Sequence, residues 1–218
     1  MTSFIFSVFT PQITASTEKS RLVRAQAATS GPPFPWFTIL FPRLKPKHTS
    51  PTAANPRQKK LCFGIGYHPA FALPFDDRHV TEDYEIRFDG VESPLCVSAQ
   101  PNGLLNGQSY YLARNVEAIQ LTDDLFDNDS HAMVNLRSAH VSVIEKDTGR
   151  SVICDVSDFP YTLIWSAPKK PLHFICIEPW HSLPGEENGP IDWEQRPCAA
   201  ILKKGESWST TLSTTFVR

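Results

Sequence analysis

The feature that most constrains the fold is a series of short, β-prone runs that starts at Leu61 and continues to Val217. Turn-forming residues separate the runs at intervals of about ten to fifteen residues, a spacing typical of β-sandwiches and barrels. No stretch keeps a helical hydrophobic period for more than about two turns, so helix should be a minor component. Residues 61–218 are therefore expected to form one all-β domain. The expected strands are Tyr84–Phe88, Leu95–Ala99, Val116–Leu121, Val141–Glu145, Ser151–Val156, Tyr161–Ser166, Phe174–Trp180, Ala199–Leu202 and Glu206–Val217.

One pair of runs predicts a hairpin. The alternating run from Val141 to Lys146 passes through Asp147-Thr148-Gly149-Arg150 into the next run at Ser151. A cluster of turn residues between two alternating runs is typical of antiparallel neighbours. The sheet is therefore expected to be antiparallel here.

Residues 1–60 differ from the rest of the chain. They hold eight of the nineteen prolines and one glycine, and nine Lys and Arg residues against one acid, Glu18. Proline removes backbone donors and fixes φ, which prevents ladders and long helices. We expect a Pro-rich basic segment that is mostly irregular or disordered. Its Ser, Thr and Ala content also fits a transit peptide, although Arg is sparse before Arg21.

Composition excludes several classes of function. Beyond residue 60 the chain carries twelve bases against twenty-two acids, whereas a nucleic-acid binder would cluster bases on its folded part. No apolar run approaches the roughly 20 residues of a membrane span, so no membrane association is expected. The five cysteines are odd in number and form no C-x-x-C, which disfavours both a disulfide framework and a zinc ribbon. A cytoplasmic protein without cofactor or metal is expected.

The segment Gly64-Ile65-Gly66-Tyr67-His68-Pro69 contains the first candidate site residue. A dinucleotide fingerprint requires glycine where Pro69 stands and a helix after it, so that interpretation fails. What remains is His68, held between Tyr67 and a proline at the end of a glycine-rich turn. Its ring is expected to face a cleft, although the segment taken alone favours a structural histidine that caps a turn.

The second candidate is Glu178, which follows the apolar strand Phe174–Ile177 and precedes Pro179-Trp180. A carboxylate in that place would be desolvated, with a raised pKa, unless it met a partner. A glutamate beside a tryptophan also suits a sugar, since the carboxylate accepts from hydroxyls while the aromatic ring covers the C–H face. A glutamate exposed at the end of a strand remains an alternative.

An acidic cluster, Asp123-Asp124-Leu125-Phe126-Asp127-Asn128-Asp129, provides a third candidate. An EF-hand loop would need glycine at its sixth position and glutamate at its twelfth, and neither is present. Calcium is therefore not expected. The cluster fits a solvated turn with at most one acid that reaches a ligand.

Five motifs in order resemble the C-terminal half of the shorter aldose 1-epimerases, the galactose mutarotase-like family. The motifs are Gly66–Phe71, Leu125–Asp129, Asp158–Tyr161, Ile164–Ser166 and Cys176–Trp180, and the match extends through Gly205-Glu206. The resemblance implies a large antiparallel β-sandwich of the galactose mutarotase-like type, with part of its N-terminal half missing. Residues 61–218 would then be a partial domain.

The family interconverts α and β anomers of free aldoses without a cofactor. By resemblance, His68 is the general acid for the ring oxygen and Glu178 the base for the anomeric hydroxyl. Asp129 is the candidate acceptor for a sugar hydroxyl, Trp165 and Trp180 are candidate pocket walls, and Tyr67 is a further candidate for substrate binding. The expected partner is a hexose.

Three interpretations of the function remain open from the sequence. Family members are longer, and their first half supplies strands and a His-Gly-Phe-Ala-Arg-like segment that is absent here. The chain is then an active epimerase, an inactive carbohydrate-binding remnant, or a truncated fragment that another chain completes. Missing strands would leave an unpaired sheet edge, which predicts self-association.

Overall fold

The computed structural model describes residues 61–100, 103–167, 171–190, 193–196 and 198–218, together with the backbone of six short strands before residue 61. Those strands are β1 (Phe4–Ile5), β2 (Val8–Phe9), β3 (Val23–Arg24), β4 (Thr38–Ile39), β5 (His48–Thr49) and β6 (Thr52–Ala54). The rest of the prediction for residues 1–60 lies outside the described residues.

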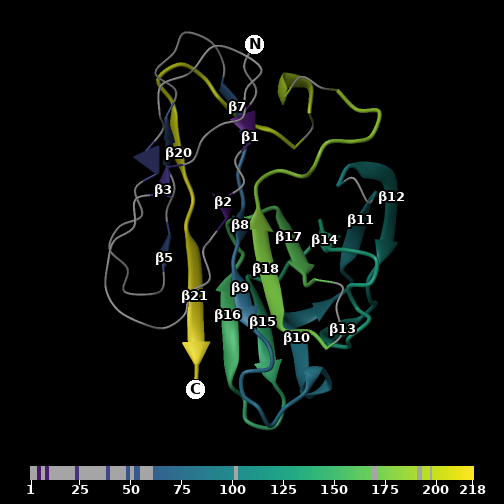
Figure 1. The fold of residues 1–218 in the computed structure, drawn as a ribbon. Coiled ribbons are helices and arrows are strands. Elements are labelled where there is room, and N and C mark those ends of the chain that lie inside the picture. Colours follow the sequence, from purple (N-terminus) through teal and green to yellow (C-terminus); the bar gives the residue numbers. More distant parts are fainter. Residues whose placement is uncertain are drawn as a thin grey trace.

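Two six-stranded sheets, each antiparallel between all neighbours, make up most of the described chain (Figure 1). The first has the order β13 (Val116–Gln120), β10 (Tyr84–Glu92), β15 (His140–Glu145), β16 (Ser151–Asp155), β21 (Leu212–Val217) and β5. The second has the order β12 (Leu105–Tyr111), β11 (Leu95–Ala99), β14 (His131–Met133), β17 (Tyr161–Trp165), β18 (Phe174–Trp180) and β9 (Ala70–Ala72). The predicted all-β architecture is confirmed.

Smaller pairings complete the description. β7 (Leu61–Gly64) lies between β1 and β19 (Ala200–Leu202), β8 (Tyr67–His68) pairs with β2, β20 (Ser207–Ser209) pairs with β6, and β3 pairs with β4. The helices in the described ranges are two single 3₁₀ turns, Thr81–Asp83 and Trp193–Gln195. No helix among the described residues has the length and hydropathy needed to cross a bilayer.

The core forms where the two large sheets face each other. On β10 the side chains of Tyr84, Ile86 and Phe88 are buried, with residues between them that are more exposed, as expected for a strand with one face on the core. Ile86 lies opposite Val143 in the same sheet and belongs to one apolar cluster with Ile177 of β18. The shared cluster shows that the two sheets pack face to face as a sandwich.

The predicted hairpin joins β15 to β16. Gly149 has φ of +76°, a conformation that glycine adopts without steric strain, and its N–H donates to the carbonyl of Glu145 at 2.9 Å. Five consecutive residue pairs align the two strands, from Ile144 opposite Ser151 to His140 opposite Asp155.

One strand predicted from the sequence is wrong, because the structure divides it in two. The run Glu206–Val217 is divided into β20 and β21, which belong to different sheets. The break falls at Thr210, whose buried hydroxyl donates to Asp158 at 2.8 Å and lies 3.1 Å from His181 Nε2. These side-chain bonds hold the chain where it passes from one sheet to the other.

Candidate active site

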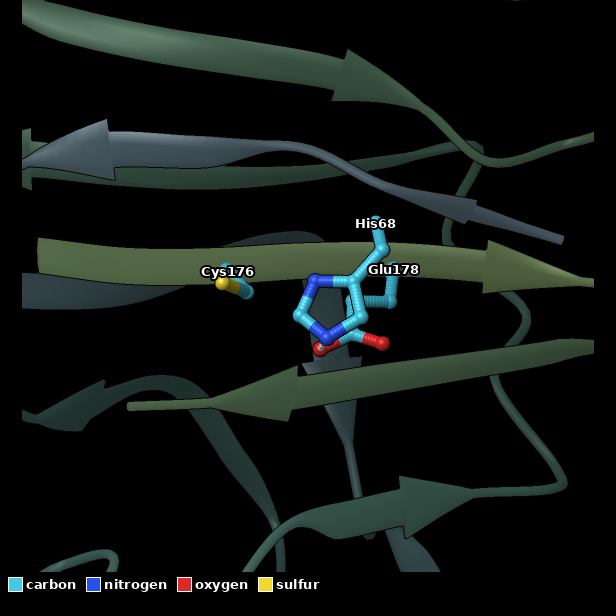
Figure 2. Close-up of side chains that lie close together, drawn as sticks. All are labelled: His68, Cys176 and Glu178. Carbon is cyan, nitrogen blue, oxygen red and sulfur yellow. Dashed lines mark ion pairs between the residues drawn. The ribbon is translucent and has the colours of Figure 1, made fainter. Parts of the chain in front are cut away.

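Strand register places His68 opposite Glu178. On one side of this position Ala70 pairs with Cys176, and on the other side Gly66 pairs with Trp180. The residues midway between these pairs are His68 and Glu178, and they must meet on the same face of the second sheet. Nε2 of His68 lies 3.3 Å from Oε1 of Glu178, and Figure 2 shows the imidazole beside the carboxylate.

Glu178 is unusual for a carboxylate because its side chain is 3% exposed, whereas that of His68 is 36% exposed. Burial raises the pKa of Glu178 to about 8, and the nearby negative charge of Asp129 adds to the effect. Burial also lowers the pKa of His68. Near neutral pH the pair therefore holds one proton, and the raised pKa of Glu178 with the lowered pKa of His68 places it on Glu178, 3.3 Å from the imidazole.

Trp165 and Trp180 lie on either side of this pair. The ring of Trp165 approaches the imidazole of His68 edge-on, with centroids 5.7 Å apart. The indole N–H of Trp180 donates to the carbonyl of Tyr67 at 3.0 Å, and its ring covers Gly66, where a Cβ would lie 2.4 Å from the ring. The two tryptophans bracket the pair along the face of the sheet.

Asp129 approaches the site from the loop before β14. It has φ of +79° and an exposed side chain, and its carboxylate accepts the N–H of Ser130 at 2.7 Å. Its charge acts on Glu178, as the raised pKa of that residue indicates. Among the four acids of the loop, Asp129 is thus the one whose field reaches the pair.

The structure does not bring the ring of Tyr67 to this face. Tyr67 precedes His68 on β8, so the two side chains point to opposite faces of the strand. The Tyr67 ring is 4% exposed and packs edge-on against Phe159 at 5.7 Å. Its carbonyl, rather than its ring, anchors the site by accepting the Trp180 bond.

The residue that sequence reasoning missed is Cys176. It lies two positions before Glu178 on β18, with a sulfur that is within 4.8 Å of donor atoms of both His68 and Glu178. The period of two along a strand could have identified it, because positions 176 and 178 must share a face.

A second group of titratable side chains connects the chain before β10 to the β15–β16 hairpin. We call it the Arg150 cluster, and its members are Asp76, His79, Tyr84, Glu145 and Arg150. Arg150 Nη2 donates to Asp76 and to Glu145, each at 2.6 Å. His79 Nδ1 lies 2.6 Å from Asp76, and the Tyr84 hydroxyl donates to Glu145 at 2.5 Å. Burial alone would raise the pKa of Glu145, but hydrogen bonds from Thr148, Tyr84 and Arg150 outweigh it and lower that pKa. The cluster is a closed ionic network with its own cation.

The fold and the pair together define a galactose mutarotase-like β-sandwich. A galactose mutarotase related enzyme from Lactobacillus acidophilus superposes with a TM-score of 0.72 and 25% identity, over 78% of this chain and 57% of that one. A galactose mutarotase-like protein from Lactobacillus casei superposes with a TM-score of 0.69 and 26% identity, over 80% and 61%. The resemblance to the aldose 1-epimerase family is confirmed.

Among curated proteins, the matches are the plasmid and chromosomal LacX proteins of Lactococcus lactis subsp. lactis. Each is 33% identical over 128 residues, which cover 58% of this chain and 42% of LacX. The chain thus spans less than half the length of these relatives. No protein-family model matches it.

Proposed function

We propose that this chain is an aldose 1-epimerase that interconverts the α and β anomers of a free hexose. The observation that carries the proposal is the 3.3 Å contact between His68 Nε2 and Glu178 Oε1 on a mutarotase-like sheet. A general acid and a general base so placed can act on two oxygens of one small substrate.

The reaction needs the proton that the pair already holds. In the minor form in which that proton has passed from Glu178 to His68, the Glu178 carboxylate takes the proton of the anomeric hydroxyl while the His68 imidazolium gives its proton to the ring oxygen. The C1–O5 bond breaks and leaves an open-chain aldehyde. After rotation about C1–C2 the ring closes on the other face, Glu178 returns its proton, and His68 regains its own. A base with a pKa of about 8 suits this exchange near neutral pH.

The surrounding side chains support a sugar as substrate. Trp165 and Trp180 offer apolar faces beside the pair, and aromatic rings cover the C–H face of pyranoses. Asp129 is proposed to accept a hydroxyl. Tyr67 acts in this scheme through its carbonyl bond to Trp180.

A second candidate function is an inactive carbohydrate-binding remnant, because the chain covers only about three fifths of the similar solved structures. The presence of both members of the acid–base pair favours the enzyme. We place the reaction in the cytoplasm, since the cysteines in the described part of the chain form no disulfide, as is usual in reducing compartments.

Polarimetry of freshly dissolved α-glucose and α-galactose tests the enzyme. We expect the chain to accelerate mutarotation and Glu178→Gln to lose roughly 10²–10⁴-fold of that acceleration, the contribution typical of one acid–base group. Glu117→Gln, at an exposed position on β13, is the matched control and should keep the wild-type rate.

A wild-type rate equal to that of buffer would reject the enzyme. Calorimetric titration with the same sugars then separates the remaining candidates, since a remnant binds sugar without turnover.

A further inference from the structure

Three different donor atoms converge at the candidate pair. A ring nitrogen of His68, the sulfur of Cys176 and a carboxylate oxygen of Glu178 all lie within 4.8 Å of one another (Figure 2). Cys176 and Glu178 project from the same face of β18, and His68 comes from β8 beside it. Imidazole nitrogen, thiolate sulfur and carboxylate oxygen are the donors that Zn²⁺ takes in proteins.

We propose that His68, Cys176 and Glu178 form a three-ligand site for Zn²⁺ or a similar transition-metal ion, with a fourth position open to solvent. In a tetrahedral zinc site the ligand atoms are about 3.3–3.8 Å apart. His68 and Glu178 already meet this spacing at 3.3 Å. The other separations are at most 4.8 Å, so a contraction of about 1 Å by side-chain rotation completes the set.

Charge favours a divalent cation in this place. Cys176 is 1% exposed and Glu178 is 2% exposed, so a thiolate and a carboxylate together would put two buried negative charges side by side. A divalent cation offsets both charges, so the site with its metal is neutral overall.

The exposed side of His68 gives a metal ion a route from solvent to the three ligands. With 36% of its side chain exposed, the imidazole borders solvent while the other two donors lie behind it. Three protein ligands with one open position is the arrangement of catalytic zinc sites, whereas structural zinc sites are closed by four.

The Arg150 cluster contains a second set of possible metal ligands. Asp76, His79 and Glu145 also bring three donors within 4.8 Å of one another. There, however, the Arg150 guanidinium already bonds both acids at 2.6 Å, so a metal would have to displace a fixed cation. We therefore assign the metal to β18 and not to this cluster.

Metal binding would engage the atoms that the proposed mutarotation requires. If the proposed function holds, Zn²⁺ and sugar turnover exclude each other, and the ion inhibits the enzyme. This consequence rests on the proposed function, whereas the binding site itself does not.

Cobalt titration of the full chain tests the site without reference to activity, because a Co²⁺–thiolate bond gives a charge-transfer absorption. We expect the band in the wild type, its loss on addition of Zn²⁺, and its absence in Cys176→Ser. Cys198→Ser, which alters a partly exposed thiol elsewhere, is the matched control and should keep the band.

His68→Gln provides a second variant, at a partly exposed position where the substitution leaves the core intact. Loss of an outer-shell partner weakens metal sites by roughly 10–100-fold, so loss of this ligand should raise the Zn²⁺ Kd by at least about 100-fold. An unchanged Kd in His68→Gln, or no thiolate band in the wild type, overturns the site.

The two proposals fail separately. A thiolate band without mutarotation keeps the metal site and rejects the epimerase, while mutarotation without the band does the reverse.

Discussion

At the scale of single residues, the protonation of Glu178 is the property on which the proposed catalysis depends. Its carboxyl lies on the face of the sheet opposite Ile177 and is covered by the chain that carries His68. Water cannot solvate its charge there, which is why its pKa lies near 8 and not at its ordinary 4.5. The same burial makes it a stronger base once substrate displaces solvent from the histidine side.

The raised pKa predicts a stability that falls with pH. Between about pH 4.5 and about pH 8 the folded chain keeps a proton on Glu178 that the unfolded chain releases, so the free energy of unfolding decreases as pH rises. Glu178→Gln removes this titration. Its Tm, relative to the wild type, should be higher at about pH 9 than at about pH 5.

A change of 1 kcal/mol shifts Tm by roughly 2–4 °C in a chain of this size, and we expect at least that difference in differential scanning fluorimetry. Glu117→Gln should show the same offset at both pH values. A pH-independent offset for Glu178→Gln would mean that the carboxyl is ionised in the folded chain.

The sequence predicted His68 and Glu178 as site residues. It did not predict which face of its strand each neighbouring side chain occupies. The resemblance assigns Tyr67 to substrate binding, although its side chain and that of the adjacent His68 must point to opposite faces of an extended strand. Cys176 was passed over as an apolar strand residue. Both outcomes follow from the strand register, which depends on pairings between segments distant in the sequence.

At the scale of elements, the contact between Gly66 and Trp180 fixes β8 against β18. A Cβ at Gly66 would lie 2.4, 2.6 and 2.9 Å from atoms of the indole ring, closer than side chains tolerate. The ring is tethered by its bond to the Tyr67 carbonyl and cannot simply rotate away. The glycine is therefore needed for close approach.

Gly66→Ala should lower the free energy of unfolding by about 1–3 kcal/mol, the usual range for overpacking, and should slow mutarotation because His68 shifts with β8. Urea denaturation and polarimetry measure the two effects. Gly90→Ala, on β10 with open space around the new methyl group, is the matched control. Equal stability of the two variants would show that the Trp180 ring moves away from the new methyl group without strain.

Strand prediction was accurate where the runs are rich in β-branched and aromatic residues and poor where they are not. β15, β16, β17 and β18 follow the predicted runs to within one residue, whereas β10 begins at the predicted Tyr84 but continues to Glu92. β12 was missed because Asn106, Gly107 and Gln108 are poor strand formers that lie exposed at an edge, and β14 because it has only three residues. Only their partners in the sheet hold these segments extended.

At the scale of the whole molecule, β12 leaves part of the second sheet unpaired among the described strands. Leu105 is bridged by Glu186, but Gly107–Tyr111 is exposed, and Tyr110 and Tyr111 are 37% and 43% exposed. An open edge with aromatic side chains is a template for pairing with another copy.

We therefore predict self-association that increases with concentration, measured by light scattering after size-exclusion chromatography. Tyr111→Lys should shift the protein toward the monomer, because lysine on an edge strand disfavours pairing. Lys204→Arg, at an exposed turn outside the two large sheets, should leave the distribution unchanged. A monomer at all concentrations would show that this edge is protected.

The position of the candidate pair in the chain has a kinetic consequence. His68 and Glu178 meet only after β17 and β18 have joined the second sheet and the chain from β8 to β9 has docked on its margin. Contacts between segments so distant in the sequence form slowly because a long loop must close first. Catalysis should thus be among the last properties to return when the unfolded chain is diluted from denaturant, later than most of its β-structure.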